Sequence, residues 1–496
     1  RGLIAHQRSC RVIEKLNGDL YDVIHSEEEN NIPDGENTTI DATPDIRPGI
    51  KLPRTQSQWT EANSFFLSAL RVDELSGENI DTAIKKMYDV IYNYFKDNYG
   101  CVNKSDENIS EYRSKYKDFT NNQLKNKLKH LKKSNSSICE IQYVSKLLRE
   151  KIKTAPPRKD SENHDNMISQ SFWHYVKKYV KKPTLTLPEF NLKTCSDYFI
   201  DVLKAKMANK TFEIPEWIPK LSEPSIPFDM TPPTYAEITK TIKQMKSSGS
   251  PCPLDKISVI LFKRCPYLRS YLTKVIQLTW ETKSIPDTWK RACTILIYKK
   301  GDPKDPSNFR PITLESIPLK VFTACLRNCI FKYLVSNNFI EHNIQKGFIP
   351  KISGAIEHTA QMAGILNNAR IKQKSLVVTL LDLRNAFGEV HHNLIKSILK
   401  YHHIPDTLID LISCLYENFY TCILTSEYCT EFIAVKRGVL QGDPFSPLIF
   451  NLCFNTFINY IKSEEYHQLG YRMGPNFSPR HWFQFADDAT ITTTNE

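Results

Sequence analysis

Residues 375–390 read SLVVTLLDLRNAFGEV, a run of apolar and β-branched side chains that ends in Asp382. Such a run, bounded by lysine and serine, predicts a buried β-strand. We expect the strand to end at Asp382 and the chain to turn from there toward a helix. The stretch therefore predicts a carboxylate delivered to the edge of a sheet.

A second acidic signal follows at residues 482–491, WFQFADDATI, where aromatic and apolar residues flank Asp487 and Asp488. The pattern predicts a hairpin whose Thr/Ile-rich continuation is a strand. Two adjacent carboxylates repel each other, and a divalent cation such as Mg²⁺ relieves the repulsion. Phosphoryl transfer by paired metals needs carboxylates from different strands, and Asp382 with this pair meets that need. An ordinary polar turn is the alternative interpretation.

Between the two acidic signals lies KRGVLQGDPFSP, residues 436–447. Gly438 and Gly442 permit close backbone approach, and the Gln441 amide both donates and accepts hydrogen bonds. Ser446 and Pro447 predict the start of a long amphipathic helix. A glycine-rich turn at a helix start favours contact with phosphate or sugar, although a simple loop-to-helix junction has the same pattern.

Farther upstream, residues 295–316 read ILIYKKGDPKDPSNFRPITLES. The pattern predicts a strand, a basic turn with Lys299 and Lys300, and a second strand preceded by Arg310. Lysine as a point charge and arginine as a fork can together hold a triphosphate. Surface charges without a ligand are the alternative.

The order NFRPI, QKGF, LLDLRNAFGEVHH, GVLQGDPFSP and FADD resembles the motif series of reverse transcriptases, and is most similar to that of non-long-terminal-repeat (LINE-type) retrotransposons. The resemblance implies an α+β fold: the fingers and palm of a right-hand polymerase, preceded by a mainly helical N-terminal extension. Because the chain ends shortly after the paired aspartates, we expect the thumb to be missing.

The resemblance also implies roles for individual residues. Those that match catalytic, magnesium-binding carboxylates are Asp382, Asp487 and Asp488. Those that match the substrate-binding positions are Lys300 or its neighbour Lys299, and Arg310, for the phosphates; Leu383, through its carbonyl; Phe387, as the steric gate against a ribose 2′-OH; and Gln441 and Gly442, which line the nucleotide.

The activity implied is the addition of deoxynucleotides to a primer 3′-OH against an RNA template, with two Mg²⁺ ions. The expected partners are an RNA template, a DNA primer or target DNA, and dNTPs. One alternative is a truncated retroelement remnant that binds nucleic acid without catalysis. Another is an RNA-templated RNA polymerase, against which Phe387 argues.

The N-terminal half divides by composition. Residues 1–12 place His6 and Cys10 four apart, the spacing of the last two ligands of a Cys/His zinc finger. They would bind Zn²⁺ only if the cysteine-bearing half of the finger were present. The pair resembles a remnant of the retrotransposon branch with N-terminal zinc fingers and a C-terminal restriction-like endonuclease. Residues 13–60 are polar and without period, which predicts a largely disordered linker.

Three further domains are expected: a helical, basic extension over 61–210, a pre-fingers extension over 211–290, and truncated fingers and palm over 291–496. In the first, Leu124, Leu128 and Leu131 form an apolar stripe surrounded by lysines. Those lysines can meet phosphates or simply be solvated.

Bulk properties fit these expectations. A formal net charge of +11 suits a polyanionic partner, since cationic side chains displace counterions from phosphates. The 13 cysteines form no Cys-x-x-Cys pair, which favours a reducing, intracellular compartment over a disulfide scaffold. We expect the protein in the nucleus and cytoplasm and not secreted. Since no apolar run is long enough to span a bilayer, we expect no membrane partner.

Overall fold

The computed structural model describes residues 39–40, 44–101, 115–116, 119–133, 138–154, 186–205, 210–340, 342–350, 352, 354–462, 466 and 468–494. The chain divides into two compact units, Arg1–Ile40 and Asp41–Glu496. Strand β1 (Thr39–Ile40) is the described part of the first unit. His6, Cys10 and most of the expected linker lie outside the described residues. The second unit contains all the other described elements.

Helices α2 (Gln56–Ala69) and α3 (Ile80–Tyr99) open this unit, with a 3₁₀ turn η1 (Gly77–Asn79) before α3. The side chains of Thr55 and Gln58 form a capping box, so α2 begins at Gln56. The linker expected to reach residue 60 therefore ends earlier, because a cap and the buried Trp59 start a helix inside it. Gly100, with φ +78°, ends α3.

Helices α5 (Asn121–Lys133) and α6 (Ile138–Thr154) contact each other and share a small apolar core. Leu124 and Leu131 are buried in it and Leu128 packs beside them, which confirms the predicted stripe. Lys125 and Lys129 are exposed on the same helix. The lysines therefore lie outside a small core that the two helices build together with Tyr116 and Phe119.

A mixed sheet within this unit has the strand order β6-β5-β2-β3. Its strands are β2 (Arg291–Tyr298), β3 (Phe309–Leu314), β5 (Tyr420–Leu424) and β6 (Phe432–Ala434). β2 pairs antiparallel with β3, as the strand–basic turn–strand pattern predicts, and parallel with β5. Short 3₁₀ turns, η2 (Asp287–Lys290) and η3 (Pro306–Asn308), precede β2 and β3.

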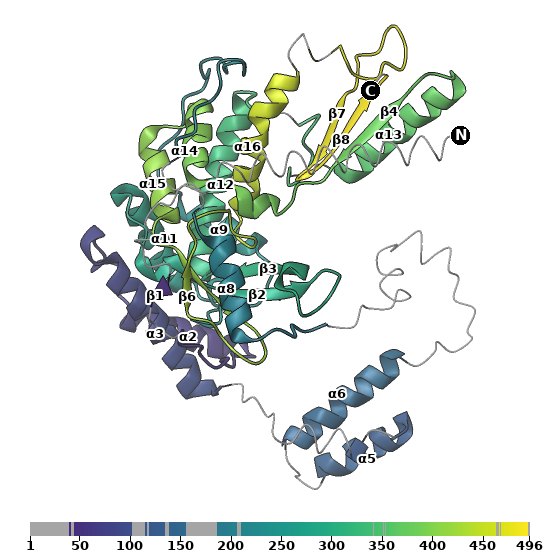
Figure 1. Cartoon of the computed structure of the whole chain (residues 1–496). Coiled ribbons are helices and arrows are strands. Elements are labelled where there is room, and N and C mark those ends of the chain that lie inside the picture. The colour runs from purple at the N-terminus through teal and green to yellow at the C-terminus, as the bar shows by residue number, and fades with distance from the viewer. Residues whose placement is uncertain are drawn as a thin grey trace. The chain divides into compact units, whose positions relative to one another are not determined.

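Most of the remaining helices build the main apolar core, and Figure 1 shows α12, α14, α15 and α16 gathered beside one another. Helix α16 begins at Ser446 with a proline in its first turn, as predicted. Helix α8 packs instead against β6. The helices are α8 (Leu192–Leu203), α9 (Tyr235–Gln244), α10 (Val259–Arg264), α11 (Pro266–Thr282), α12 (Ile317–Ser336), α14 (His392–Tyr401), α15 (Asp406–Tyr416) and α16 (Ser446–Ile461).

A second, antiparallel sheet has the order β4-β8-β7 and carries the acidic motifs. It consists of β4 (Val377–Leu381), β7 (Trp482–Phe485) and β8 (Asp488–Thr493). Helix α13 (Gly354–Ile371) lies along this sheet (Figure 1) and contacts β7. The expected α+β class is confirmed. Within the described ranges, no helix has the length and apolar character needed to cross a membrane.

Candidate active site

The paired aspartates lie at the tip of the β7–β8 hairpin. Phe485 pairs with Asp488, so Ala486 and Asp487 are the two residues of the turn. Ala486 has φ +57°, a value that tight hairpin turns require and that alanine adopts at a cost. The predicted hairpin is thus present, and its turn backbone is held in an unusual conformation.

Strand pairing brings the third aspartate to this tip. β4 pairs with β8 up to Leu381 opposite Ala489, and the next residue on each strand is Asp382 and Asp488. Opposed residues of an antiparallel pair have Cβ atoms about 4.5–5.5 Å apart. Partial burial, then the neighbouring charges of Asp487 and Asp382, raise the pKa of Asp488. Three carboxylates from two segments far apart in the chain therefore share one edge of the sheet.

Carboxylate oxygens are the donors that hard divalent cations take, so these side chains fit such an ion by chemistry. Reverse transcriptase domains generally use divalent metal ions. In the described part of the chain, however, no three acidic, histidine or cysteine side chains are already gathered closely enough to hold one. The backbone thus brings the donors to the same edge, while the side chains do not form a closed ligand set.

Strand β4 departs from the sequence prediction in its burial. The strand was expected to be buried, but Leu380 is 77% exposed and Val378 is 39% exposed. In the described structure α13 reaches the sheet at β7, and no helix covers β4 to a comparable extent. An apolar run of this kind signals a strand but not which elements cover it.

The predicted steric gate, Phe387, lies in the 3₁₀ turn η4 (Ala386–Glu389) that follows Asp382. Its ring stacks on Phe450 of α16, with centroids 4.7 Å apart and planes within 8°. The ring of Phe348 meets it edge-on at 6.0 Å. Leu383, whose carbonyl was expected to contact substrate, is exposed beside Asp382. The Phe387 ring is therefore fixed by contacts with two other aromatic rings.

Gln441 and Gly442 pack against strand β3. The backbone N–H of Thr313 donates to the Gln441 carbonyl at 2.7 Å. Gly442 has φ +134°, and a Cβ there would lie 2.3 Å from the Thr313 oxygen, so only glycine fits. A cavity of about 50 Å³ is lined by Gln441, Thr313 and Gly388 among others. The structure thus joins this turn to β3 and to the turn after Asp382.

Two buried acids beneath this turn were not singled out from the sequence. Burial raises the pKa of Asp443, and burial together with Asp443 raises that of Glu315 well above its usual value. The Asp443 carboxylate accepts hydrogen bonds from the Phe445 N–H at 3.2 Å and the Ser446 hydroxyl at 3.4 Å. Asp443 therefore holds together the turn between Gln441 and the start of α16.

The basic residues expected to hold phosphates lie on the β2–β3 hairpin. Lys299 and Lys300 follow β2, Arg310 pairs with Ile297, and all three basic side chains are exposed. Among the described residues, no ion pair or side-chain hydrogen bond links Lys300 or Arg310 to the three aspartates. The structure thus brings the aspartates together but does not join the basic hairpin to them.

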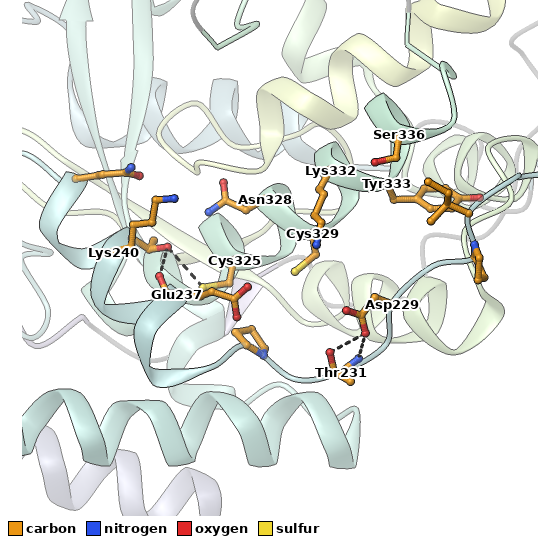
Figure 2. Close-up of a pocket in the computed structure, with 15 residues that line it drawn as sticks. Asp229, Thr231, Glu237, Lys240, Cys325, Asn328, Cys329, Lys332, Tyr333 and Ser336 are labelled. Carbon is orange, nitrogen blue, oxygen red and sulfur yellow. Dashed lines mark hydrogen bonds between the residues drawn. The ribbon is translucent and has the colours of Figure 1, made fainter.

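A separate cavity of about 510 Å³ lies between α9, α12 and the proline-rich segment before α9. Figure 2 shows Thr231 donating to Asp229 at its rim, through both its N–H and its hydroxyl. Lys240 and Lys332 also line it. None of the predicted site residues is among its lining residues, so this cavity has no part in the site built around Asp382.

One residue of the QKGF motif contacts the site in a way the sequence did not reveal. Gln345 is 3% exposed and hydrogen-bonds the backbone of Ala486 in the aspartate turn. The motif itself was visible in the sequence as part of the ordered series, but nothing in its residues assigned the glutamine a partner.

Comparison with known proteins agrees with the motif order. A family model for reverse transcriptase (RNA-dependent DNA polymerase) matches residues 297–496. This range begins inside β2 and includes the basic hairpin, the turn at Gln441 and all three aspartates.

Among curated proteins, the chain is similar to retrovirus-related Pol polyproteins of R2 retrotransposable elements. It is 31% identical to the type-1 R2 protein of Nasonia vitripennis over 34% of this chain and 16% of that protein. It is 29% identical to a type-1 R2 protein of Popillia japonica over 52% of this chain and 34% of that protein. It is 26% identical to the type-2 R2DM protein of Drosophila melanogaster over 49% of this chain and 22% of that protein.

The matched segments thus cover at most about a third of these relatives. The range of the family model includes the sheet edge that joins the three aspartates. The chain therefore carries a reverse transcriptase domain of the non-long-terminal-repeat retrotransposon type.

Proposed function

We propose that the chain synthesises DNA on an RNA template, adding deoxynucleotides to the 3′-OH of a DNA primer or nicked target. The observation that carries the proposal is the pairing of β4 with β8, which sets Asp382 next to Asp488 at the hairpin tip. On this proposal the sheet with α16 is the palm, and the β2–β3 hairpin belongs to the fingers of a right-hand polymerase.

Asp382, Asp487 and Asp488 are the proposed ligands of two Mg²⁺ ions. Partial burial, and after it the charges of Asp487 and Asp382, raise the pKa of Asp488, and a cation bound at this edge would offset that negative charge. When bound, such ions lower the pKa of the primer 3′-OH and stabilise charge on the departing pyrophosphate. The side chains themselves orient the reacting groups and hold them in line.

The remaining predicted residues are proposed to bind the nucleotide. Lys300 and Arg310 are exposed cations that can hold its phosphates. Phe387, held between Phe348 and Phe450, presents a fixed ring that can exclude a 2′-OH. The Gln441–Gly442 backbone and the Leu383 carbonyl are proposed to line the base and sugar.

Primer extension on poly(rA)/oligo(dT) with dTTP and Mg²⁺ tests the proposal. Wild-type chain should incorporate dTTP, and Asp487→Ala should reduce incorporation by at least about a hundredfold, as expected when a charge-stabilising group is lost from a polymerase centre. Asp410→Ala, an exposed aspartate on α15, is the matched control and should retain activity. Equal incorporation by Asp487→Ala and wild type would contradict the proposed metal site.

A second function, nucleic-acid binding without catalysis, is favoured by the α5–α6 pair alone. Its exposed Lys125 and Lys129 lie outside the small core that the two helices share with Tyr116 and Phe119. RNA binding by the wild-type chain with no dTTP incorporation under any divalent ion would support this function over polymerisation.

A further inference from the structure

The QKGF motif lies directly against the turn that carries the paired aspartates. The backbone N–H of Lys346 donates to the Gln484 carbonyl at 3.0 Å, and the N–H of Gln484 donates to the Ile344 carbonyl at 3.1 Å. Gln345 is thereby set beside the end of β7, in a parallel bridge with Gln484. The pairing joins two segments that lie far apart in the reverse transcriptase domain.

The Gln345 side chain completes the hydrogen bonding of the turn. Its Oε1 accepts from the Ala486 N–H at 2.8 Å, and its Nε2 donates to the Ala486 carbonyl at 3.1 Å. The same Oε1 accepts from the Gly347 N–H at 2.8 Å, which holds the side chain in place. Both polar groups of Ala486 are therefore bound by one buried amide.

Ala486 needs this support because of its backbone. Its φ of +57° is unfavourable for any residue with a side chain, and its N–H and carbonyl lie at a buried position. Gln484 adds a further bond to the Ala486 carbonyl, from Nε2 at 2.9 Å. The conformation that sets the directions of Asp487 and Asp488 thus depends on hydrogen bonds from outside the two-residue turn.

The rest of the motif ties this turn to the other parts of the site. A Cβ on Gly347 would lie 2.3 Å from the Ala486 nitrogen, so glycine permits the approach. The Gly347 carbonyl accepts from Asn451 of α16 at 2.8 Å. Phe348, with φ +60°, places its ring against the gate residue Phe387. Backbone strain of this kind in a bulky residue persists only where the surrounding structure enforces it.

We infer that Gln345 is a positioning residue that holds the Ala486 turn in the conformation from which Asp487 and Asp488 bind divalent cations with Asp382. The inference rests on the proposed function, because it concerns the same carboxylates. It adds that cation affinity depends on a buried neutral amide whose hydrogen bonds go to the backbone of Ala486 and Gly347.

Mn²⁺ binding to the full chain, measured by electron paramagnetic resonance, tests this without requiring polymerisation. Gln345→Met keeps the volume and removes the hydrogen bonds, whereas Gln345→Asn keeps the amide but is too short to reach Ala486. Both should weaken Mn²⁺ binding by roughly tenfold, the usual effect of losing a group that orients metal ligands. Circular dichroism checks that each variant is folded. If one of the two variants does not fold, the Mn²⁺ affinity of the other tests the inference.

Asn455→Leu is the matched control. Asn455 is a buried amide on α16 that bonds the Phe339 carbonyl and His402, away from the turn. This variant should lose thermal stability and keep wild-type Mn²⁺ affinity. If it weakens Mn²⁺ binding as much as Gln345→Met does, the effect is general destabilisation and the inference is wrong.

Asp487→Ala separates the inference from the proposed function. Loss of Mn²⁺ binding in Asp487→Ala with wild-type affinity in both Gln345 variants would overturn the positioning role and leave the proposed metal site intact. Unchanged Mn²⁺ binding in Asp487→Ala would overturn the metal site itself.

Discussion

At the scale of single residues, packing against neighbouring rings fixes the orientation of Phe387 in the candidate site. Phe387 lies between two other rings, stacked on Phe450 and met edge-on by Phe348. A ring held in this way loses little freedom when a nucleotide binds beside it. The proposed role of Phe387 in discriminating between sugars rests on this fixed position of the ring.

Phe387→Ala should lower the preference for dTTP over UTP by about tenfold or more, since opening room for one small group is worth roughly that factor. The ratio of kcat/KM values for the two nucleotides on poly(rA)/oligo(dT) measures it. Phe477→Ala, an exposed aromatic outside the predicted site, serves as the control. An unchanged ratio in Phe387→Ala would favour the RNA-templated RNA polymerase interpretation.

At the scale of elements, buried polar side chains join helices that the sequence shows only as separate amphipathic segments. His402 follows α14 and is fully buried; its Nδ1 donates to the Ile398 carbonyl at 2.7 Å and its Nε2 accepts from Asn455 of α16 at 2.9 Å. This pattern requires neutral imidazole. Burial lowers the pKa of His402 to about 4.

The free energy of unfolding should therefore fall as the pH drops from about 6.5 toward 4. Because the folded pKa lies below the unfolded value of about 6.5, the contribution of His402 is complete above that pH and is lost toward pH 4. The loss is at most about 1.4 kcal/mol per pH unit for one proton.

Urea denaturation of wild type and His402→Gln at about pH 7.5 and pH 5, on either side of the unfolded pKa, measures this dependence. The variant should be less stable at the higher pH and should lose less free energy of unfolding on acidification. His130→Gln, exposed on α5, should keep the wild-type pH dependence. A variant at His402 with the full wild-type pH dependence would show that another group is responsible.

At the scale of the whole molecule, the charge balance predicts salt-dependent binding to nucleic acid. The chain carries a formal net charge of +11, and α5 presents lysines outside its core. Cations that neutralise phosphates release counterions, so affinity falls steeply with salt.

Replacing Lys125 and Lys129 together by glutamine should weaken binding to single-stranded RNA of any sequence. It should also reduce the slope of log affinity against log salt by about 0.7 for each phosphate that the protein no longer neutralises. Fluorescence anisotropy between low and physiological salt measures both. Lys85→Gln, whose lysine is paired with Asp81, is the control. A slope unchanged in the double variant would exclude α5 from the RNA-binding surface.

The amino-acid sequence by itself determined the local elements and the identity of the acidic, aromatic and basic side chains. The β7–β8 hairpin, the strand before Asp382 and the start of α16 were all predicted, because turn residues and hydrophobic period act over a few neighbouring positions. The order of the motifs was by itself enough to identify the domain.

Only the tertiary structure decided which of these elements meet and what covers them. The exposure of β4, the buried pair Glu315 and Asp443, and the bonds from Gln345 to Ala486 all depend on segments distant in the chain. Such arrangements arise from strand pairing and packing across the whole unit, which no short sequence pattern encodes. A glutamine in a loop becomes a support for the aspartate turn solely because the fold brings that turn to it.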